Sequence, residues 1–248
     1  MTAVNSSLKK RTSKVEREED LQCRGLKIIQ DDRLYTFTSD SVVLANFVKI
    51  KKGEKAVEIG AGSGVISILL SAKMPVSKIY AFELQNEMAS LAKRNVALNF
   101  LEDKIEVIND DIANFQNHVE RAGFSVVFSN PPYMNSSNEN ASEVKAIARH
   151  DKFLSCEKLC KMASALLKEK GRFYLCYPPE RLCELFVEMS KCGLEPKRMF
   201  LTENNKKQIK LCFIEAVKGA SHGLKILPNL TVNDADGKYL ESLHTKYF

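Results

Sequence analysis

Lys55-Ala56-Val57-Glu58-Ile59-Gly60-Ala61-Gly62-Ser63-Gly64 is the stretch that decides the fold of this 248-residue chain. Its first half reads as a buried parallel strand, its second half places glycines on alternate residues, and an apolar helix is expected from Val65 to about Lys73. A strand, a glycine turn and a helix in that order bring backbone N–H groups and the positive end of a helix to one point. Because glycine lets the backbone approach a ligand closely, the stretch predicts a binding loop rather than a plain tight turn.

The spacing of these glycines excludes two common nucleotide-binding loops. The dinucleotide fingerprint G-x-G-x-x-G requires a glycine at position 65, where this chain has valine. A Walker-type phosphate loop requires G-K-[ST], which does not follow here. The loop present is Glu58-x-Gly60-x-Gly62-x-Gly64, with an acid inside the end of the strand.

Acids also end the next two predicted strands. The strand Lys78–Glu83 closes on Glu83, where dinucleotide folds use a carboxylate to accept the hydroxyls of a ribose. After a helix at 86–99, the strand Lys104–Ile108 runs into Asn109-Asp110-Asp111-Ile112. One of these aspartates is well placed to accept from an adenine amino group, and helix capping explains them equally well.

A second stretch, Val126-Val127-Phe128-Ser129-Asn130-Pro131-Pro132-Tyr133, carries the other half of the predicted site. The prolines fix φ and lack an N–H, so the chain leaves the strand as a stiff elbow at the carboxyl edge, where open α/β sheets bind ligands. The Asn130 carboxamide and the Pro131 carbonyl are then available as acceptors, and the Tyr133 ring offers a flat face. This combination suits a planar group with an NH₂. A proline-rich turn after a core strand is the plain alternative.

The region before the glycine loop leaves two alternatives open. Residues 1–24 are polar, with Lys9, Lys10 and Arg11 among the basic ones, and are either a solvated flexible tail, the favoured interpretation, or a basic arm that touches phosphate. A short strand is expected at Leu26–Gln30. Ser39 and Asp40 precede a helix expected from about Val42 to Lys49, and they either cap it or contact a ligand.

The second half continues the alternation of helices and strands. Residues 134–150 read as a long polar loop, either a lid or a disordered segment. The elements expected after it are a helix at about 153–168 closed by Gly171, a strand at 172–177, a helix at 180–191, strands at 196–201 and 211–217, and a short helix at 239–248. The hairpin region 202–210 holds Lys206, Lys207 and Lys210, and with Lys197 and Arg198 it is the densest basic cluster. This cluster either follows phosphates or is a solvated hairpin.

Strands alternating with helices predict a parallel sheet with right-handed crossovers. Seven strands, of which the last two form a hairpin, make it a doubly wound α/β sheet with an antiparallel edge strand. Neither an internal repeat nor an inter-domain linker is visible, so residues 25–248 are expected to form one domain behind the arm of residues 1–24.

Composition limits the classes of function. No apolar run approaches the roughly 18 residues of a membrane span, and the polar N-terminus lacks a signal-peptide core, so a cytoplasmic protein without membrane contact is expected. The seven cysteines include no C-x-x-C pair and the four histidines are isolated, so we expect reduced thiols and no metal. A net charge of +6 permits a polyanionic partner without requiring one.

Taken together, these residues resemble the class I S-adenosylmethionine-dependent methyltransferases, whose fold is Rossmann-like. Glu58 to Gly64 and Glu83 resemble that superfamily's cofactor motifs, and Asn130-Pro131-Pro132-Tyr133 resembles the (N/D)-P-P-(Y/F) motif of its amino-group methylating branch. The resemblance covers roughly residues 36–218. Within the branch, the compact form with Phe37-Thr38-Ser39-Asp40 is similar to the bacterial tRNA(Val) adenine-37 N6-methyltransferase family, although the segment after Tyr133 is generic and the N-terminal arm is long for that family.

The resemblance implies S-adenosylmethionine as cofactor, a tRNA bound by its anticodon region as substrate, and a monomer that acts without a metal. It implies catalytic roles for Asn130, Pro131, Pro132 and Tyr133. The implied cofactor contacts are Ser39, Asp40, Glu58, Gly60, Ala61, Gly62, Gly64, Glu83, Asp111, Ile112 and Asn130. The implied RNA contacts are Lys9, Lys10, Arg11, Lys197, Arg198, Lys206, Lys207 and Lys210.

Other functions share these motifs. Glutamine N5-methylation of release factors uses the same Asn-Pro-Pro-Tyr, although those enzymes usually carry a helical domain before the cofactor loop. Base N-methylation of rRNA is a further alternative, and DNA adenine methylation usually requires a recognition insert that is not visible here. A non-catalytic RNA-binding protein on a methyltransferase scaffold is the alternative of a different class, and the intact glycine loop, Glu83 and Asn130 argue against it.

Overall fold

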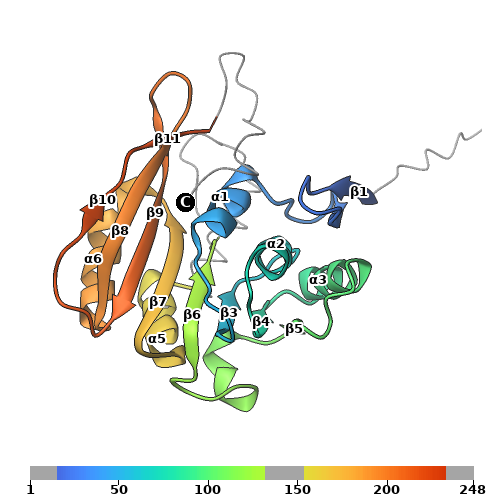
Figure 1. Ribbon diagram of the computed structural model, residues 1–248, viewed down its shortest axis with the longest axis horizontal. Coiled ribbons are helices and arrows are strands. Elements are labelled where there is room, and N and C mark those ends of the chain that lie inside the picture. The colour runs from blue at the N-terminus through green and yellow to red at the C-terminus, as the bar shows by residue number, and fades with distance from the viewer. Residues whose placement is uncertain (1–15, 132–153, 233–248) are drawn as a thin grey trace, which may run out of the picture.

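A nine-stranded mixed sheet forms the centre of the structure, a computed structural model that describes residues 16–131 and 154–232 (Figure 1). Five neighbouring strands are parallel, in the order β5 (Ile105–Ile108), β4 (Lys78–Phe82), β3 (Lys55–Ile59), β6 (Phe124–Ser129) and β7 (Leu167–Tyr177). Beyond β7 lie β9 (Ile209–Lys218), β8 (Leu194–Glu203) and the two-residue strands β10 (Lys225–Ile226) and β11 (Leu230–Thr231). The predicted doubly wound sheet is confirmed.

The antiparallel strand is inside the sheet and not at its edge, which corrects one detail of the prediction. β9 pairs antiparallel with both β7 and β8. The chain crosses from β7 through the short helix η2 (Pro179–Arg181) and helix α6 (Leu182–Lys191) to β8, which does not pair with β7. The chain then returns as β9, which lies between β7 and β8 and pairs with both. β8 therefore runs parallel to β7, and its carboxyl end lies at the same edge of the sheet.

Helices cover both faces of the sheet, as a doubly wound fold requires. On one face, α1 (Ser39–Phe47), α2 (Val65–Lys73) and part of α3 (Asn86–Leu98) pack on one apolar cluster that includes Ala56 and Phe128. On the other face, η1 (Ile112–Asn117), α5 (Cys156–Leu166) and α6 pack on a second cluster that includes Val57 and Val127. Adjacent residues of β3 and β6 thus point to opposite clusters, which is why most residues of both strands are apolar on both faces.

An antiparallel hairpin of β1 (Glu16–Asp20) and β2 (Lys27–Asp31) stands outside the main sheet and packs on α3. Two asparagines of α3 bind the free edge of β2. Asn95 accepts from Ile29 N at 2.7 Å and donates to Ile29 O at 3.1 Å, and Asn99 does the same to Lys27 at 2.9 and 2.7 Å. Asn95 also donates to Ser63 O at 3.0 Å, so it joins the hairpin to the glycine turn.

The structure differs from the sequence-based expectation at residues 16–24, for which a flexible tail is the favoured interpretation. These residues form β1 and its turn, because Leu21 is buried and Arg94 of α3 pairs with Glu16 at 2.7 Å. The expected start of helix α1 and the expected role of Gly171 are wrong. Helix α1 begins at Ser39 and not at Val42. Several neighbouring polar residues suit a helix start, so the sequence alone does not fix the first residue. The helix is buried from Ser41 to Phe47. Gly171 lies within β7 and does not close α5.

Steric crowding explains why position 171 holds a glycine. A Cβ there would come within 2.8 Å of the Leu167 side chain and of Lys168 O, at a shift of register between β6 and β7.

Several predicted features fall outside the described residues: Lys9, Lys10, Arg11, Pro132, Tyr133, the loop 134–150 and the helix 239–248. Each helix among the described residues is too short or too polar to cross a lipid bilayer.

Asn95 gives a test of this arrangement. Its side chain is fully buried, so Asn95→Ala leaves backbone groups of Ile29 and Ser63 unpaired. At about 1–3 kcal/mol for each unpaired buried group, we expect the free energy of unfolding, measured by urea denaturation, to fall by about 3 kcal/mol. Asn99→Ala is the matched control, because its similar bonds are more exposed, and its loss should be nearer about 1 kcal/mol. Equal losses for the two variants would contradict the role of burial.

Candidate active site

The glycine turn and the Asn130 elbow leave the sheet side by side. Glu58 of β3 stands in register with Phe128 of β6, and Ser129 Oγ donates to Ile59 O at 2.7 Å across the same pair of strands. The chain runs from β3 outward to β4 and β5, then returns past β3 to β6 and β7, so the direction of the strand order reverses between β3 and β6. Open α/β sheets bind their ligands at the carboxyl end of such a reversal.

The glycine turn has the open backbone that its sequence predicts. Gly60, Gly62 and Gly64 have φ of 74°, 55° and 82°, the left-handed region that disfavours other residues. Gly60 N and Ala61 N both donate to Phe82 O at 2.9 Å, which fixes the turn to the end of β4. Among the described residues other than its two chain neighbours, none has an atom within 4 Å of the position that a Cβ on Gly60 would take. The space above this residue therefore suits a ligand that lies against the backbone.

Glu83 is held by the backbone around it. Its Oε2 accepts from Gly62 N at 2.8 Å and its Oε1 accepts from Gln85 N at 2.9 Å. The side chain is buried, yet each carboxylate oxygen has a second lone pair. A fixed carboxylate of this kind fits the predicted role of accepting from two adjacent hydroxyls.

Glu58 is fully buried on the face covered by α1 and α2. Ser67 Oγ of α2 donates to its Oε2, while its Oε1 has no partner among the described residues. Burial raises the pKa of Glu58 to about 8, against the opposing effect of the Ser67 bond. A buried acceptor without a partner, beside an open glycine turn, fits an ammonium group of a bound ligand.

The residues after β5 have protein partners that sequence reasoning left open. Asp111 Oδ1 accepts from Ala113 N at 2.9 Å and so caps η1, and its Oδ2 pairs with Lys158 of α5 at 2.9 Å. Asp110 accepts from Asn114 and lies 2.8 Å from His118 Nε2, and the hydrogen bond to His118 is the first cause that lowers the pKa of Asp110. Capping of η1 is therefore present, and Ile112 beside it is buried.

The start of α1 joins the site from the other side. Asn130 Nδ2 donates to Ser41 Oγ at 3.2 Å, a contact between residues far apart in the chain. Thr38 Oγ1 donates to Asp40 Oδ2 at 2.8 Å, and burial raises the pKa of Asp40. Thr38 is the N-cap residue but makes no side-chain cap bond, and Asp40 lies in the first turn of the helix. Ser41 is the site residue that sequence reasoning missed, since nothing in its local pattern separates it from Ser39.

The structure separates the five predicted basic residues into two groups. Lys206, Lys207 and Lys210 lie on and beside the turn that closes the β8–β9 hairpin, and Lys207 pairs with Glu203. Figure 1 shows this turn projecting at the end of the sheet at which α1 begins. Lys197 and Arg198 lie further back along β8, where Arg198 pairs with Glu215 at 2.9 Å and Lys197 donates to Ser221 O at 3.0 Å.

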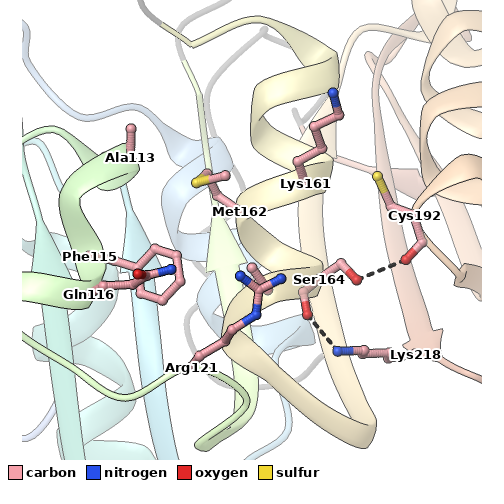
Figure 2. Close-up of a pocket in the computed structure, with 10 residues that line it drawn as sticks. Ala113, Phe115, Gln116, Arg121, Lys161, Met162, Ser164, Cys192 and Lys218 are labelled. Carbon is pink, nitrogen blue, oxygen red and sulfur yellow. Dashed lines mark hydrogen bonds between the residues drawn. The ribbon is translucent and has the colours of Figure 1, made fainter.

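A hollow of about 390 Å³ lies away from these residues, between η1 and the second half of α5 (Figure 2). Several of its polar groups are bound within the protein. Ser164 Oγ donates to Cys192 O at 2.8 Å, and Lys218 Nζ donates to Ser164 O at 2.7 Å, as the dashed lines in Figure 2 show. Because the hollow is near the amino ends of the parallel strands, it is not part of the site.

This fold and this site define a class of protein. A doubly wound sheet with an open glycine turn after its first core strand and a fixed carboxylate after the second is the architecture of methyltransferases that use S-adenosylmethionine. Residues 37–178, more than half of the chain, match the model of the methyltransferase small domain, and the chain belongs to this family. Its cofactor is S-adenosylmethionine.

Individual relatives agree with this assignment. The chain is 31% identical over 179 residues to a tRNA1(Val) (adenine(37)-N6)-methyltransferase of Bacteroides thetaiotaomicron, covering 66% of this chain and 74% of that protein. A protein of the same description from Dyadobacter fermentans is 24% identical over 223 residues, 89% of this chain and 92% of that protein. The solved structure of M. jannaschii TYW2 in complex with AdoMet aligns with a TM-score of 0.57 at 16% identity, over 83% of this chain and 86% of that one, and so shares the fold.

The raised pKa of Glu58 predicts how stability depends on pH. Between its ordinary value of 4.5 and about 8, the folded protein binds one proton more than the unfolded chain, so the free energy of unfolding falls as pH rises through this window. The fall is at most about 1.4 kcal/mol per pH unit. In urea unfolding of the protein without cofactor, from about pH 5 to about pH 8, Glu58→Gln should gain stability relative to the wild type. A difference between the two proteins that does not change with pH would contradict this assignment.

Proposed function

We propose that the protein transfers the methyl group of S-adenosylmethionine to the exocyclic N6 of an adenine in a tRNA, at position 37 beside the anticodon. The observation that carries this proposal is the adjacency of the glycine turn and the Asn130 elbow, fixed by the β3–β6 register and the Ser129–Ile59 hydrogen bond. A methyl donor on the turn and a planar amine at the elbow then lie next to each other. The tRNA and position 37 come from the two relatives described above.

The residues of the turn fit the cofactor. Gly60 leaves the backbone open, and Ala61, Gly62 and Gly64 complete the turn against which the cofactor lies. Glu83 accepts from the ribose hydroxyls, and Oε1 of Glu58, which has no partner among the described residues, accepts from the ammonium of the methionine part. Asp40 and Ser39, at the start of α1, face the same end, and Asp111 with Ile112 flanks the adenine. Asp111 keeps its bonds to Ala113 N and Lys158 in this arrangement, and a second lone pair on either oxygen accepts from the adenine amino group.

The elbow activates the target nitrogen. S-adenosylmethionine supplies an electrophilic methyl group on a sulfonium when bound. Asn130 and the Pro131 carbonyl accept the two N6 hydrogens, which favours a pyramidal nitrogen with its lone pair directed at the methyl group. The bound cofactor would supply the methyl group and leave as the thioether, and the methylated nitrogen would give up a proton to water. Because positive charge develops on this nitrogen, both acceptors bind more strongly in the transition state than in the ground state.

Ser41 holds Asn130 in the orientation that this step requires. Its Oγ accepts from Asn130 Nδ2 at 3.2 Å, so rotation of the carboxamide is restricted and Oδ1 serves as acceptor for the substrate. Orientation of this kind contributes on the order of 7–11 kcal/mol in favourable cases, so a general base is not required. Pro132 and Tyr133 follow Pro131 in the sequence and lie outside the described residues, and the proposed role of Tyr133 is to stack on the extruded adenine.

The hairpin lysines lie at the edge of the sheet that holds the site, where the RNA backbone must pass. Lys206 and Lys210 are exposed and have no recorded ion-pair partner in residues 16–131 and 154–232, whereas Lys207 is paired with Glu203. Lys197 and Arg198 are engaged within the protein and contribute less to RNA binding.

A tRNA substrate also implies a cytoplasmic location. The proposed enzyme acts as a monomer.

Asn130→Ala tests the reaction. We expect kcat for methyl transfer to tRNA to fall by about 10²–10³-fold, as for loss of one transition-state hydrogen bond, while the cofactor affinity measured by calorimetry changes little. Asn117→Ala, an exposed asparagine of η1, is the matched control and should keep full activity. Retention of normal turnover by Asn130→Ala would remove the elbow from the mechanism.

The same assay with bulk tRNA, rRNA, a release factor and DNA as acceptors identifies the substrate. Transfer to an adenine N6 of tRNA supports the proposal. Transfer to rRNA, to a glutamine side chain or to DNA points to the corresponding alternative. Cofactor binding without transfer to any of them favours an RNA-binding role.

The lysines of the hairpin predict the salt dependence of RNA binding. Substitution of Lys206, Lys207 and Lys210 by alanine should weaken binding to all tRNAs alike and reduce the slope of log K against log salt by about 2, because Lys207 is already paired. Substitution of Lys51, Lys52 and Lys55, three exposed lysines at the opposite edge of the sheet, is the control. An unchanged slope in the hairpin variant would mean that these lysines are only solvated.

A further inference from the structure

An exposed aromatic ring stands beside the proposed acceptor site and has no role in the reaction described so far. Tyr35 lies in the segment between β2 and α1, four residues before the first residue of that helix, and its side chain is 60% exposed. The helix it leads into carries Asp40 and Ser41, and Ser41 is the residue bound to Asn130. Tyr35 is therefore close in the chain to the group that contacts the target amine.

The surroundings of the phenol place Tyr35 at the β6–β7 side of the site. Partial burial raises the pKa of Tyr35, the Asp40 carboxylate and the Cys176 thiol add to the rise, and a hydrogen bond with Thr38 opposes it. Ser129 stands in register with Leu175, so the next residues along the two strands are Asn130 and Cys176. Tyr35 therefore precedes the start of α1, the end of that helix at which Ser41 binds Asn130.

These observations give the ring an unusual combination of properties. Its side chain makes a hydrogen bond with Thr38, and 60% of its surface is open to solvent. A rigid aromatic ring with an open face binds nucleobases by stacking, with little dependence on which base is presented. An enzyme that extrudes one base from an RNA loop leaves the neighbouring base without its stacking partner. The exposed ring beside the acceptor site meets this requirement.

We propose that Tyr35 is a positioning residue that stacks on the nucleobase adjoining the target adenine. This inference rests on the proposed function for the identity of the RNA. Tyr133, expected to stack on the target itself, and Tyr35 would then hold two successive bases. The ring would fix the register of the loop, so that the correct adenine reaches Asn130.

Binding of a fluorescent RNA tests the proposal without methyl transfer. An anticodon stem-loop carries 2-aminopurine either at the target position or at an adjoining one, and stacking on an aromatic ring quenches its emission. We expect the wild type and Tyr35→Phe to quench the adjoining probe and Tyr35→Leu, which keeps apolar volume without a ring face, to lose that quenching. RNA affinity should fall about tenfold in Tyr35→Leu, with unchanged cofactor affinity and an unchanged salt slope.

Phe100→Ala is the matched control. Phe100 is an exposed aromatic residue, 87% accessible, beyond the end of α3 and remote from Asn130, and its loss should leave quenching and affinity unchanged. Thermal unfolding confirms that each variant is folded. Equal quenching by Tyr35→Leu and the wild type, or quenching confined to the target-position probe, would overturn the proposal.

The outcomes for Tyr35 and for the reaction are separable. Quenching that depends on Tyr35 in a protein that methylates another atom supports the stacking role and rejects the proposed reaction. Methylation of the adenine N6 with normal kcat/KM by Tyr35→Leu rejects the stacking role and leaves the reaction intact.

Discussion

The pairing of β3 with β6 is the constraint on which the rest of the site depends. Neither strand carries a catalytic group in its interior, but their register brings Gly60 and Asn130 to the same edge, and the Ser129–Ile59 hydrogen bond closes the pair at that edge. A shift of this register by one residue would turn every side chain of β6 to the opposite face, and both apolar clusters would lose their partners. The packing of the two apolar clusters therefore fixes both the strand register and the position of the site residues.

Charged and polar groups near this edge are bound by backbone or by buried partners, and few are left to solvent. Glu83 is fixed by two backbone N–H groups, Asn95 links the turn to the β1–β2 hairpin, and Ser41 restrains Asn130. Glu58 is the exception, since one of its buried oxygens lacks a partner and burial raises its pKa to about 8. Such a group is costly in the protein alone, and under the proposed function a cofactor ammonium would remove this cost on binding.

Local sequence patterns predicted most elements because each pattern has a local physical cause. Alternate glycines require an open turn, prolines end a strand, and apolar runs of strand length are buried in a parallel sheet. The prediction failed where several residues suited one role. Thr38, Ser39 and Asp40 all suit the start of α1, Gly171 suits both a helix end and a close approach in a strand, and the polar run at 16–24 concealed a strand whose partner is β2.

The sequence by itself determined the class of fold, the cofactor turn, Glu83 and the elbow, because these depend on backbone conformation and on residue types within a few positions of each other. The tertiary structure alone decided which distant groups meet: Ser41 with Asn130, Asn95 with Ser63, Lys158 with Asp111, and the place of β9 between β7 and β8. Such contacts arise when strand order and helix packing bring separate segments together. That order is set by burial over the whole chain, and no local pattern encodes it.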